Sequence, residues 1–309
     1  MPAGLSVIVV SWNAASVIEG CLASLLDNAP DRPFEILVLD NASRDRTTSL
    51  VRPYTPEVNL VELDTNLGFA GACNEGYRLS RHDYLLFLNC DVRVYPSALE
   101  SLSGFMDSHP EAGAAGGHLL DAHGHPQRGF NVRAFPTLLS AAIEILLLDK
   151  VFPRNPVTRA QRMLDFSFSE TSEVDQPAGA CLLVRRSVFE SVGRFDEKFY
   201  PAWFEDVDLC LRLKESGHRV FFVPEARFLH YGGASLESLD YREFLSIWYG
   251  NLLRYFGKHH GKSSTALLKG LILIGMLLRL SVTLLMKAKP GLSQREARSA
   301  YWQVIKETL

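Results

Sequence analysis

Short apolar segments bounded by polar residues recur along most of the chain, a pattern that is typical of strands buried on both faces of a sheet. They lie at residues 5–10, 34–39, 59–63, 84–88, 180–184 and 220–223. Segments with helical spacing alternate with them, at residues 15–26, 138–152, 187–192 and 205–217. This alternation predicts βαβ units and therefore an α/β fold with a mostly parallel sheet.

Polar triplets follow three of these strands directly: Ser11-Trp12-Asn13, Asp40-Asn41-Ala42 and Asn89-Cys90-Asp91. Because ligands bind beyond the carboxyl ends of strands in open α/β sheets, we expect the triplets to gather at one binding edge. An ionised carboxylate at such a dry position is costly to bury without a partner. A divalent cation would be a suitable partner for Asp91, although an ordinary turn aspartate that caps the next helix would need none.

Composition narrows the class of protein. The 309 residues are 47% hydrophobic, which is enough for one large α/β domain with an appendage and argues against disorder. The net charge of -3 argues against a nucleic-acid partner. The five scattered cysteines and the short apolar N-terminal run predict a cytoplasmic protein with buried thiols and no signal peptide.

The C-terminal region differs from the rest in charge. From Gly250 onward it holds ten Lys and Arg against two Asp and Glu, which leaves 22 and 33 in the remainder. Residues 266–286 are apolar and long enough to span a bilayer. A narrow polar stripe runs along this segment, formed by Lys269, Arg279, Thr283 and Lys287. We predict a helix lying in the membrane interface; spanning the bilayer, or packing on its own domain or on a second subunit in a homodimer, are the alternatives.

Three further features are candidates for chemistry. Residues 66–74 are rich in small side chains, which would let the backbone approach a ligand closely. Glu205, Asp206 and Asp208 begin one helix, where they either offset the helix dipole or supply a general base, and the dipole is expected to lower their pKa. Asp208 is spaced to pair with Arg212. His230 follows a strand, as a structural residue or as a metal ligand.

The motifs occur in one order along the chain: SWN, DNAS, NLGFAGACN, LNCD, PAGACLLVRR, GRFDEKFYPAWFEDVDLCLRL and RFLHYGGAS. With this set, residues 5–262 resemble the inverting family 2 glycosyltransferases, and most of all the bacterial rhamnosyltransferase-type enzymes. The resemblance implies a GT-A (Rossmann-like) fold, with a mixed, mostly parallel sheet flanked by helices. It also implies a nucleotide-diphospho-sugar donor, Mn²⁺ or Mg²⁺, and a lipid-linked or polyprenyl-diphosphate-linked glycan acceptor in polysaccharide or lipopolysaccharide synthesis. dTDP-L-rhamnose is the preferred donor, and a UDP-hexose is the alternative.

The resemblance also implies roles for individual residues. Asp206 would be the catalytic base with Glu205 orienting the acceptor, and Asp91 and His230 would bind the metal. Asn-Cys-Asp departs from the usual Asn-Pro-Asp at Cys90. The donor-binding residues would be Ser11, Asn13, Asp40, Asn66, Gly68, Asn74, Asn89 and Asp91. Residues facing the acceptor or phosphates would be Gly179, Ala180, Trp203, Asp208, Arg254 and Lys258.

The expected organisation has three parts. Residues 1–117 would bind the nucleotide sugar, residues 118–235 would bind the acceptor, and residues 236–309 would form a helical extension that places the enzyme peripherally on the cytoplasmic face of the cell membrane. A nucleotidyltransferase is disfavoured because Ser-Trp-Asn stands where its Gly/Arg/Lys-rich loop is usual. A catalytically inactive sugar-nucleotide-binding protein would be expected to have lost Asp91 or Asp206, and both are present.

Overall fold

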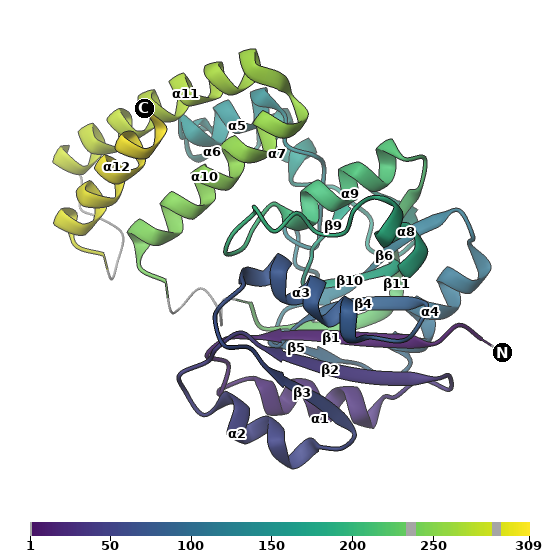
Figure 1. The fold of residues 1–309 in the computed structure, drawn as a ribbon. Helices are drawn as coiled ribbons and strands as arrows, with labels where there is room; N and C mark the ends of the chain where they lie inside the picture. Colours follow the sequence, from purple (N-terminus) through teal and green to yellow (C-terminus); the bar gives the residue numbers. More distant parts are fainter. Residues whose placement is uncertain (1, 233–238, 286–291) are drawn as a thin grey trace. The chain divides into compact units, whose positions relative to one another are not determined.

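The computed structural model describes residues 2–232, 239–285 and 292–309, and the chain folds into two compact units (Figure 1). Unit 1 comprises Met1–Phe135, Arg162–Pro201 and Glu205–Ser235. Unit 2 comprises Pro136–Gln161, Ala202–Phe204 and Leu236–Leu309. Residue 117 lies inside unit 1, and the predicted division of labour between its two sides stays a prediction.

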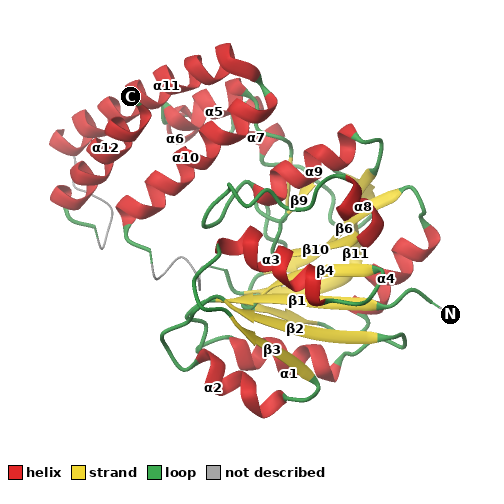
Figure 2. Cartoon of the chain, viewed as in Figure 1, coloured by secondary structure: helices red, strands yellow, loops and turns green. Residues whose placement is uncertain are grey.

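Unit 1 is built on a mixed sheet, which has nine strands among the described residues (Figure 2). The strand order is β3-β2-β1-β4-β10-β6-β11-β5, and β8 pairs with β11. The strands are β1 (Leu5–Ser11), β2 (Phe34–Asp40), β3 (Val58–Glu62), β4 (Tyr84–Asn89), β5 (Val92–Val94), β6 (Ala112–Leu120), β8 (Ser172–Glu173), β10 (Cys181–Arg185) and β11 (Arg219–His230). A separate ribbon pairs β7 (Val132–Arg133) with β9 (Gln176–Pro177). The predicted mixed α/β sheet is confirmed.

Strand register aligns the polar strand ends. Strands β1, β2, β3 and β4 run parallel, with Ser11 opposite Asp40 and Val10 opposite Asn89. Strand β10 is antiparallel to both β4 and β6, and β11 runs parallel to β6. The three polar triplets therefore end at one edge of the sheet, as the sequence pattern predicts.

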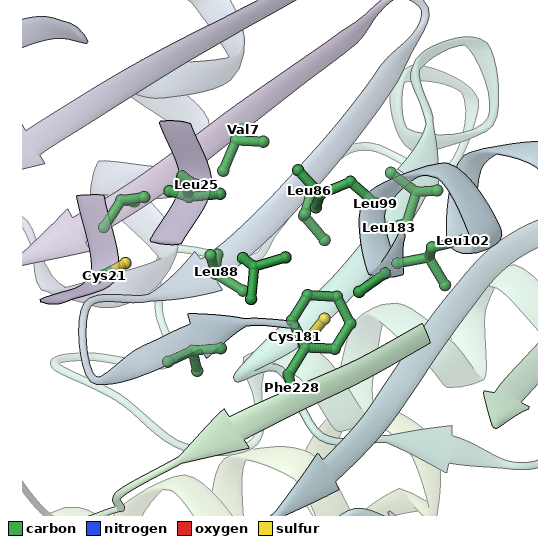
Figure 3. Packing of buried hydrophobic residues seen from close by; sticks show 14 of the residues in the cluster. Val7, Cys21, Leu25, Leu86, Leu88, Leu99, Leu102, Cys181, Leu183 and Phe228 are labelled. Atoms are coloured by element: carbon green, nitrogen blue, oxygen red, sulfur yellow. The ribbon is translucent and has the colours of Figure 1, made fainter. Parts of the chain in front are cut away.

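Helices cover both faces of the sheet of unit 1. They are α1 (Ile18–Asp27), α2 (Thr47–Val51) with the 3₁₀ turn η1 (Arg52–Tyr54), α3 (Gly68–Leu79), α4 (Ala98–Ser108), α8 (Arg186–Ser191) and α9 (Glu205–Glu215). Alternate strand residues serve opposite cores: Val7 and Leu86 pack with α1 and α4, whereas Ile8 and Phe87 pack on the side of α3, α8 and α9. Figure 3 shows the first core, where Leu86, Leu88, Leu99, Leu102 and Phe228 gather. Burial on both faces explains why these strands are continuously apolar.

The small residues of α3 serve packing against the protein. A Cβ atom on Gly76 would lie 2.5 Å from Ile8 Cγ2, so this glycine lets α3 approach the sheet closely. Gly68 has a positive φ of 73°, and a Cβ there would lie 2.9 Å from the Pro201 carbonyl oxygen. Phe69 N also donates to that oxygen, at 2.7 Å. Both glycines therefore make room for neighbouring parts of unit 1, and the expected approach of a ligand to residues 66–74 stays a prediction.

Two predicted elements differ in extent from the observed ones. Strand β11 continues to His230 instead of ending at residue 223, because a register shift between Val223 and Arg227 carries the strand past Pro224. The helix predicted over residues 138–152 is broken into α5 (Leu138–Ile145) and α6 (Leu148–Val151), since Leu147 adopts a left-handed φ of 61°.

Unit 2 is helical. Besides α5 and α6 it contains α7 (Pro156–Gln161), α10 (Tyr241–His259), α11 (Gly261–Leu285) and α12 (Gln294–Thr308). Capping boxes begin α10 at Asp240 and α12 at Ser293. The side chain of each cap residue accepts from the backbone N of the glutamate three residues later, and its own backbone N donates to that glutamate's side chain. The predicted helical extension after residue 236 is present in the described residues.

Helix α11 has a packed face and an exposed apolar face. It packs against α5, α10 and α12, burying Leu268, Ile272 and Met276. Four large apolar side chains on the other face are exposed: Leu267 (55%), Ile274 (57%), Leu277 (53%) and Leu278 (39%). The described part of the chain contains one helix that is long and apolar enough to cross a membrane, over Gly261–Thr283.

The predicted polar stripe of α11 does not face outward as a whole. The Arg279 guanidinium donates to the carbonyl oxygen of Ile145 in α5, and Thr283 is buried. Lys269 is exposed, and Lys287 lies outside the described residues. The outward orientation expected for Arg279 is therefore wrong, because this side chain donates to the C-terminal carbonyls of α5, and large apolar side chains are exposed on the helix beside Lys269.

Candidate active site

Asp91 and His230 face one another at the edge of the sheet. Strand β5 pairs antiparallel with β11 and places Val92 opposite His230, while Tyr231 N donates to the Asp91 carbonyl oxygen at 3.1 Å. The two side chains are buried, and His230 Nε2 lies 3.5 Å from Asp91 Oδ1. Among the described residues Asp91 Oδ1 has no hydrogen-bond donor. The structure thus brings together the two predicted metal ligands and leaves a carboxylate oxygen available.

A divalent cation fits this donor set. An oxygen and an imidazole nitrogen suit Mn²⁺, and Mg²⁺ and Mn²⁺ in sugar-nucleotide and phosphate sites commonly use few protein ligands, with substrate phosphates and water supplying the rest. Among the described residues no group of three or more His, Cys, Asp or Glu is arranged to hold a metal ion by itself. Burial, and then the charge of Asp91, raise the pKa of the neighbouring Cys90 thiol to about 12.

The His230 side chain also contacts two residues that the sequence analysis did not single out. Gln127 Oε1 lies 2.8 Å from His230 Nδ1, and Gln127 Nε2 donates to the His230 carbonyl oxygen at 2.8 Å. Phe130 stacks on the imidazole with the ring centroids 5.1 Å apart. Gln127 and Phe130 belong to an irregular stretch, so no periodic pattern signals them.

Residues of the first two polar triplets form their hydrogen bonds mainly within the two loops that follow β1 and β2. Asp40 is buried, and its carboxylate accepts from Ser11 Oγ at 3.1 Å and from Ser43 Oγ at 2.6 Å. Asn13 N donates to Ser43 Oγ, and Asn13 Oδ1 accepts from Arg44 N. Asp40 therefore closes the turn after β2 and ties it to β1, and its predicted contact with the donor stays a prediction.

The loop before α3 is likewise internally bonded. Asn66 Oδ1 accepts from Gly68 N, and the Asn41 amide bridges Leu67 N and the Gly68 carbonyl. Asn74 is buried, and its side chain exchanges hydrogen bonds with the Phe195 backbone and donates to Glu197. The structure therefore gives Asn74 a bracing role between α3 and the loop after α8, which differs from the predicted contact with the donor.

The loop over residues 177–180 connects the carboxylates of α9 to strand β4. Gly179 N donates to Asp206 Oδ2 at 2.8 Å, and the Ala180 carbonyl accepts from Asn89 N at 3.0 Å. Val207 N donates to Asp206 Oδ1 at 2.8 Å, and Gln176 Nε2 donates to Oδ2 at 3.2 Å. These hydrogen bonds hold the Asp206 carboxylate in one orientation, and the residue as a whole is half-buried.

Burial, and not the helix dipole, dominates the titration of the first two carboxylates. Loss of water raises the pKa of Asp206, against the opposing hydrogen bonds from Gly179 and Val207 and the charge of Arg133. Burial and then the charge of Asp206 raise the pKa of Glu205 well above its usual value. The expected lowering of their pKa is therefore wrong. Glu205 is only 6% exposed, and its Oε2 has no donor among the described residues, which places it beneath the surface that an acceptor would touch.

Asp208 belongs to the core of α9. It is fully buried, and Arg212 donates to its Oδ2 from Nε at 2.8 Å and from Nη2 at 2.6 Å. Arg212 also donates to the carbonyl of Arg194 at 2.7 Å. The predicted pairing with Arg212 is confirmed, and the predicted contact of Asp208 with acceptor or phosphate is wrong because this pair keeps the carboxylate inside.

The remaining predicted residues lie in unit 2. Trp203 has a positive φ of 74°, and its ring lies 5.1 Å from the Phe244 ring and 5.9 Å from the Trp248 ring of α10. Arg254 and Lys258 are both exposed, one turn apart on α10. Their contact with phosphates stays a prediction.

Comparison with known proteins establishes the family. The model of glycosyl transferase family 2 matches residues 6–193. The chain is 33% identical over 238 residues to the N-acetylglucosaminyl-diphospho-decaprenol L-rhamnosyltransferase of Mycobacterium tuberculosis, covering 74% of this chain and 76% of the relative. It is 28% identical over 230 residues to the rhamnosyltransferase WbbL of Escherichia coli, covering 73% and 82%. The chain belongs to glycosyl transferase family 2, whose members are inverting glycosyltransferases.

Solved structures support the fold. A mannosyltransferase from Pyrobaculum calidifontis, solved with GDP-Man and Mn²⁺, matches with a TM-score of 0.56 at 16% identity, covering 99% of this chain and 86% of that one. The TarS protein of S. aureus, solved with UDP-GlcNAc, matches with a TM-score of 0.55 at 18% identity, covering 99% and 82%. These matches confirm the GT-A fold of this chain.

Proposed function

We propose that this chain transfers L-rhamnose from dTDP-L-rhamnose to a lipid-linked glycan, as a step of cell-surface polysaccharide synthesis. The names of the relatives support rhamnose as the sugar and a polyprenol-diphosphate-linked N-acetylglucosamine as the model for the acceptor. The observation that carries the chemistry is Asp206, a half-buried carboxylate fixed by Gly179 and Val207 at the start of α9.

Asp206 acts as the general base. An acceptor hydroxyl is a poor nucleophile and must lose its proton as it attacks the anomeric carbon, so a fixed carboxylate beside it lowers the barrier. A single displacement inverts the anomeric centre and requires no covalent nucleophile on the enzyme. When the buried Glu205 is protonated it carries no charge and does not repel a negative charge on Asp206. This helps Asp206 to be the ionised carboxylate of the two.

Asp91 and His230 would hold the metal, since they are the buried pair that leaves a carboxylate oxygen without a donor. When bound, a divalent cation neutralises charge on the departing nucleotide diphosphate as a Lewis acid. Asn89 at the end of β4, with Asn13 and Asn66 in loops of the same unit, would complete the donor site. Calorimetry tests this assignment: Asp91→Ala should lose the Mn²⁺-dependent part of the dTDP affinity, and unchanged Mn²⁺-dependent affinity would overturn it.

Unit 2 places the enzyme at the cytoplasmic face of the membrane, where a lipid-linked acceptor is found. The four exposed apolar side chains of α11 support this, because exposed apolar helix faces mark interaction with lipid or protein. Arg254 and Lys258, exposed on α10, supply charges for lipid or substrate phosphates. A homodimer that covers the same apolar face is the alternative.

A donor assay decides between the candidate activities. The purified enzyme is incubated with Mn²⁺, an N-acetylglucosaminyl-diphospho-polyprenol, and either dTDP-L-rhamnose or a panel of UDP-hexoses. We expect transfer from dTDP-L-rhamnose that EDTA abolishes. Transfer from a UDP-hexose alone would favour the second candidate donor, and donor binding without transfer to any acceptor would indicate an inactive sugar-nucleotide-binding protein.

A further inference from the structure

The Gln127 side chain contacts His230 at two points. Its Nε2 donates to the His230 carbonyl oxygen at 2.8 Å, and its Oε1 lies 2.8 Å from Nδ1 of the imidazole ring. This side-chain amide therefore contacts both the backbone and the ring of one residue, 103 positions away in sequence.

The backbone carbonyl determines which way the amide points. A carbonyl oxygen only accepts hydrogen bonds, so the Gln127 NH₂ group must face it, and Oε1 must face the ring. Oε1 in turn only accepts, so Nδ1 of His230 must carry a hydrogen. In the neutral ring the other nitrogen, Nε2, is then left with its lone pair.

That lone pair is directed at an acceptor. Asp91 Oδ1 lies 3.5 Å from His230 Nε2, is buried, and has no hydrogen-bond donor among the described residues. Two electron-rich atoms that face each other in a buried place repel unless a proton on Nε2 or a metal cation lies between them. The opposite tautomer would place a hydrogen on Nε2 and close this position to a metal.

Gln127 is itself rigidly placed. Its backbone N donates to the Leu119 carbonyl at the end of β6, and its carbonyl accepts from Asn131 N at 2.9 Å. The buried Asn131 side chain ties the same turn to β6, by accepting from Leu119 N and donating to the Gly117 carbonyl. Phe130 stacks on the imidazole and limits its rotation.

We propose that Gln127 is a positioning residue that fixes His230 in the Nδ1–H tautomer, so that Nε2 offers its lone pair, together with Asp91, to the divalent cation of the donor site. The inference rests on the metal site of the proposed function, and it adds the residue that prepares that site before the metal arrives. Partners of metal-binding imidazoles set ring orientation and tautomer in this way, and their loss typically lowers metal affinity about 10–100-fold.

The direct test is the tautomer in the metal-free protein. Long-range ¹H–¹⁵N correlation spectra of histidine-labelled protein, recorded where imidazole is neutral, separate the two tautomers, and His230→Asn identifies the His230 signals. We expect the Nδ1–H form in the parent protein and in Gln127→Glu, which keeps an acceptor opposite Nδ1. Gln127→Leu, which removes it, should shift His230 toward the Nε2–H form.

Mn²⁺ calorimetry in the presence of dTDP gives the second readout. Gln127→Leu should bind Mn²⁺ about 10–100-fold more weakly, while Gln127→Glu should retain most of the parental affinity. Gln303→Leu, the same substitution on α12 of unit 2, is the matched control and should change neither readout.

Each outcome decides something. If Gln127→Leu keeps both the Nδ1–H tautomer and parental Mn²⁺ affinity, the proposal is wrong. If Gln127→Leu does not fold, Gln127→Glu decides, because an Nε2–H tautomer there would overturn the proposal and an Nδ1–H tautomer with parental Mn²⁺ affinity would support it. If the parent protein binds no Mn²⁺, the metal site of the proposed function fails, and the spectra of the metal-free variants still decide whether Gln127 sets the tautomer.

Discussion

Gly179 and Asp206 are in direct contact: Gly179 N donates to Asp206 Oδ2 at 2.8 Å, and a Cβ atom on Gly179 would lie 3.0 Å from both Cβ and Oδ2 of Asp206. The absence of a side chain at residue 179 is therefore what lets the loop over residues 177–180 reach the carboxylate. Through Ala180, the same loop is bonded to the end of β4. The orientation of Asp206 is thus tied to the edge of the sheet.

Gly179→Ala should lower turnover without preventing donor binding. The added methyl group pushes Asp206 from its position, and small displacements of a catalytic group can cost about 10²-fold in rate. We expect kcat to fall at least tenfold, with the Kd for donor and Mn²⁺ nearly unchanged. Gly104→Ala on α4 is the matched control, because a Cβ there meets nothing within 4 Å, and it should leave kcat as in the parent. Equal kcat in the two variants would contradict this role.

Arg212→Ala should destabilise unit 1 strongly. It removes the guanidinium that pairs with the fully buried Asp208, and breaking a buried ion pair from one side costs about 3–5 kcal/mol. The free energy of unfolding in urea measures the loss. Arg52→Ala removes an exposed partner of Glu62, where such pairs contribute only about 0–1 kcal/mol. A similar loss in both variants would show that burial of Asp208 is not the cause.

The buried Glu205 makes stability depend on pH. Because its folded pKa is raised above the usual 4.5, the folded protein holds a proton that the unfolded chain releases. This contribution is fully present below about pH 4.5 and is lost as the pH rises through the folded pKa. Glu205→Gln should therefore become more stable relative to the parent as the pH rises. Urea unfolding at stepped pH measures this difference, which should stay flat for the exposed Glu57→Gln; a flat difference for Glu205→Gln would refute the claim.

The membrane proposal is tested on the exposed face of α11. Ile274→Ser with Leu277→Ser removes two exposed apolar side chains, so sedimentation with anionic vesicles should fall several-fold while the thermal unfolding midpoint changes little. Leu79→Ser alters a leucine of unit 1 that is 46% exposed, and it should sediment like the parent. Parental sedimentation of the α11 variant would count against membrane binding through this face. If the variant instead converts a dimer to a monomer, the apolar face belongs to a homodimer.

The parts of the fold that depend on local pattern could be predicted from sequence. Continuous apolar runs gave the central strands because both faces of the sheet are buried, and the i,i+4 spacing gave the Asp208–Arg212 pair. The convergence of Asp91 and His230 followed from placing both at strand ends.

Long-range packing decided what the sequence could not. A small residue such as Gly76 is equally compatible with a ligand and with a close sheet, and only the position of Ile8 distinguishes them. Sequence spacing predicts that Arg279 belongs to an outward basic stripe of α11, yet its guanidinium donates to the Ile145 carbonyl of α5, 134 residues away. Gln127 has no periodic context, and its relation to His230 exists only in the folded chain.

The central claim is that Asp206 is the base of sugar transfer, and the most direct measurement is single-turnover transfer by Asp206→Asn at saturating donor, acceptor and Mn²⁺. Asparagine preserves the shape of the side chain but cannot take the proton. We predict a rate about 10²–10⁴-fold below the parent, with donor affinity by calorimetry within about twofold of the parent. Near-parental transfer by Asp206→Asn would contradict the account.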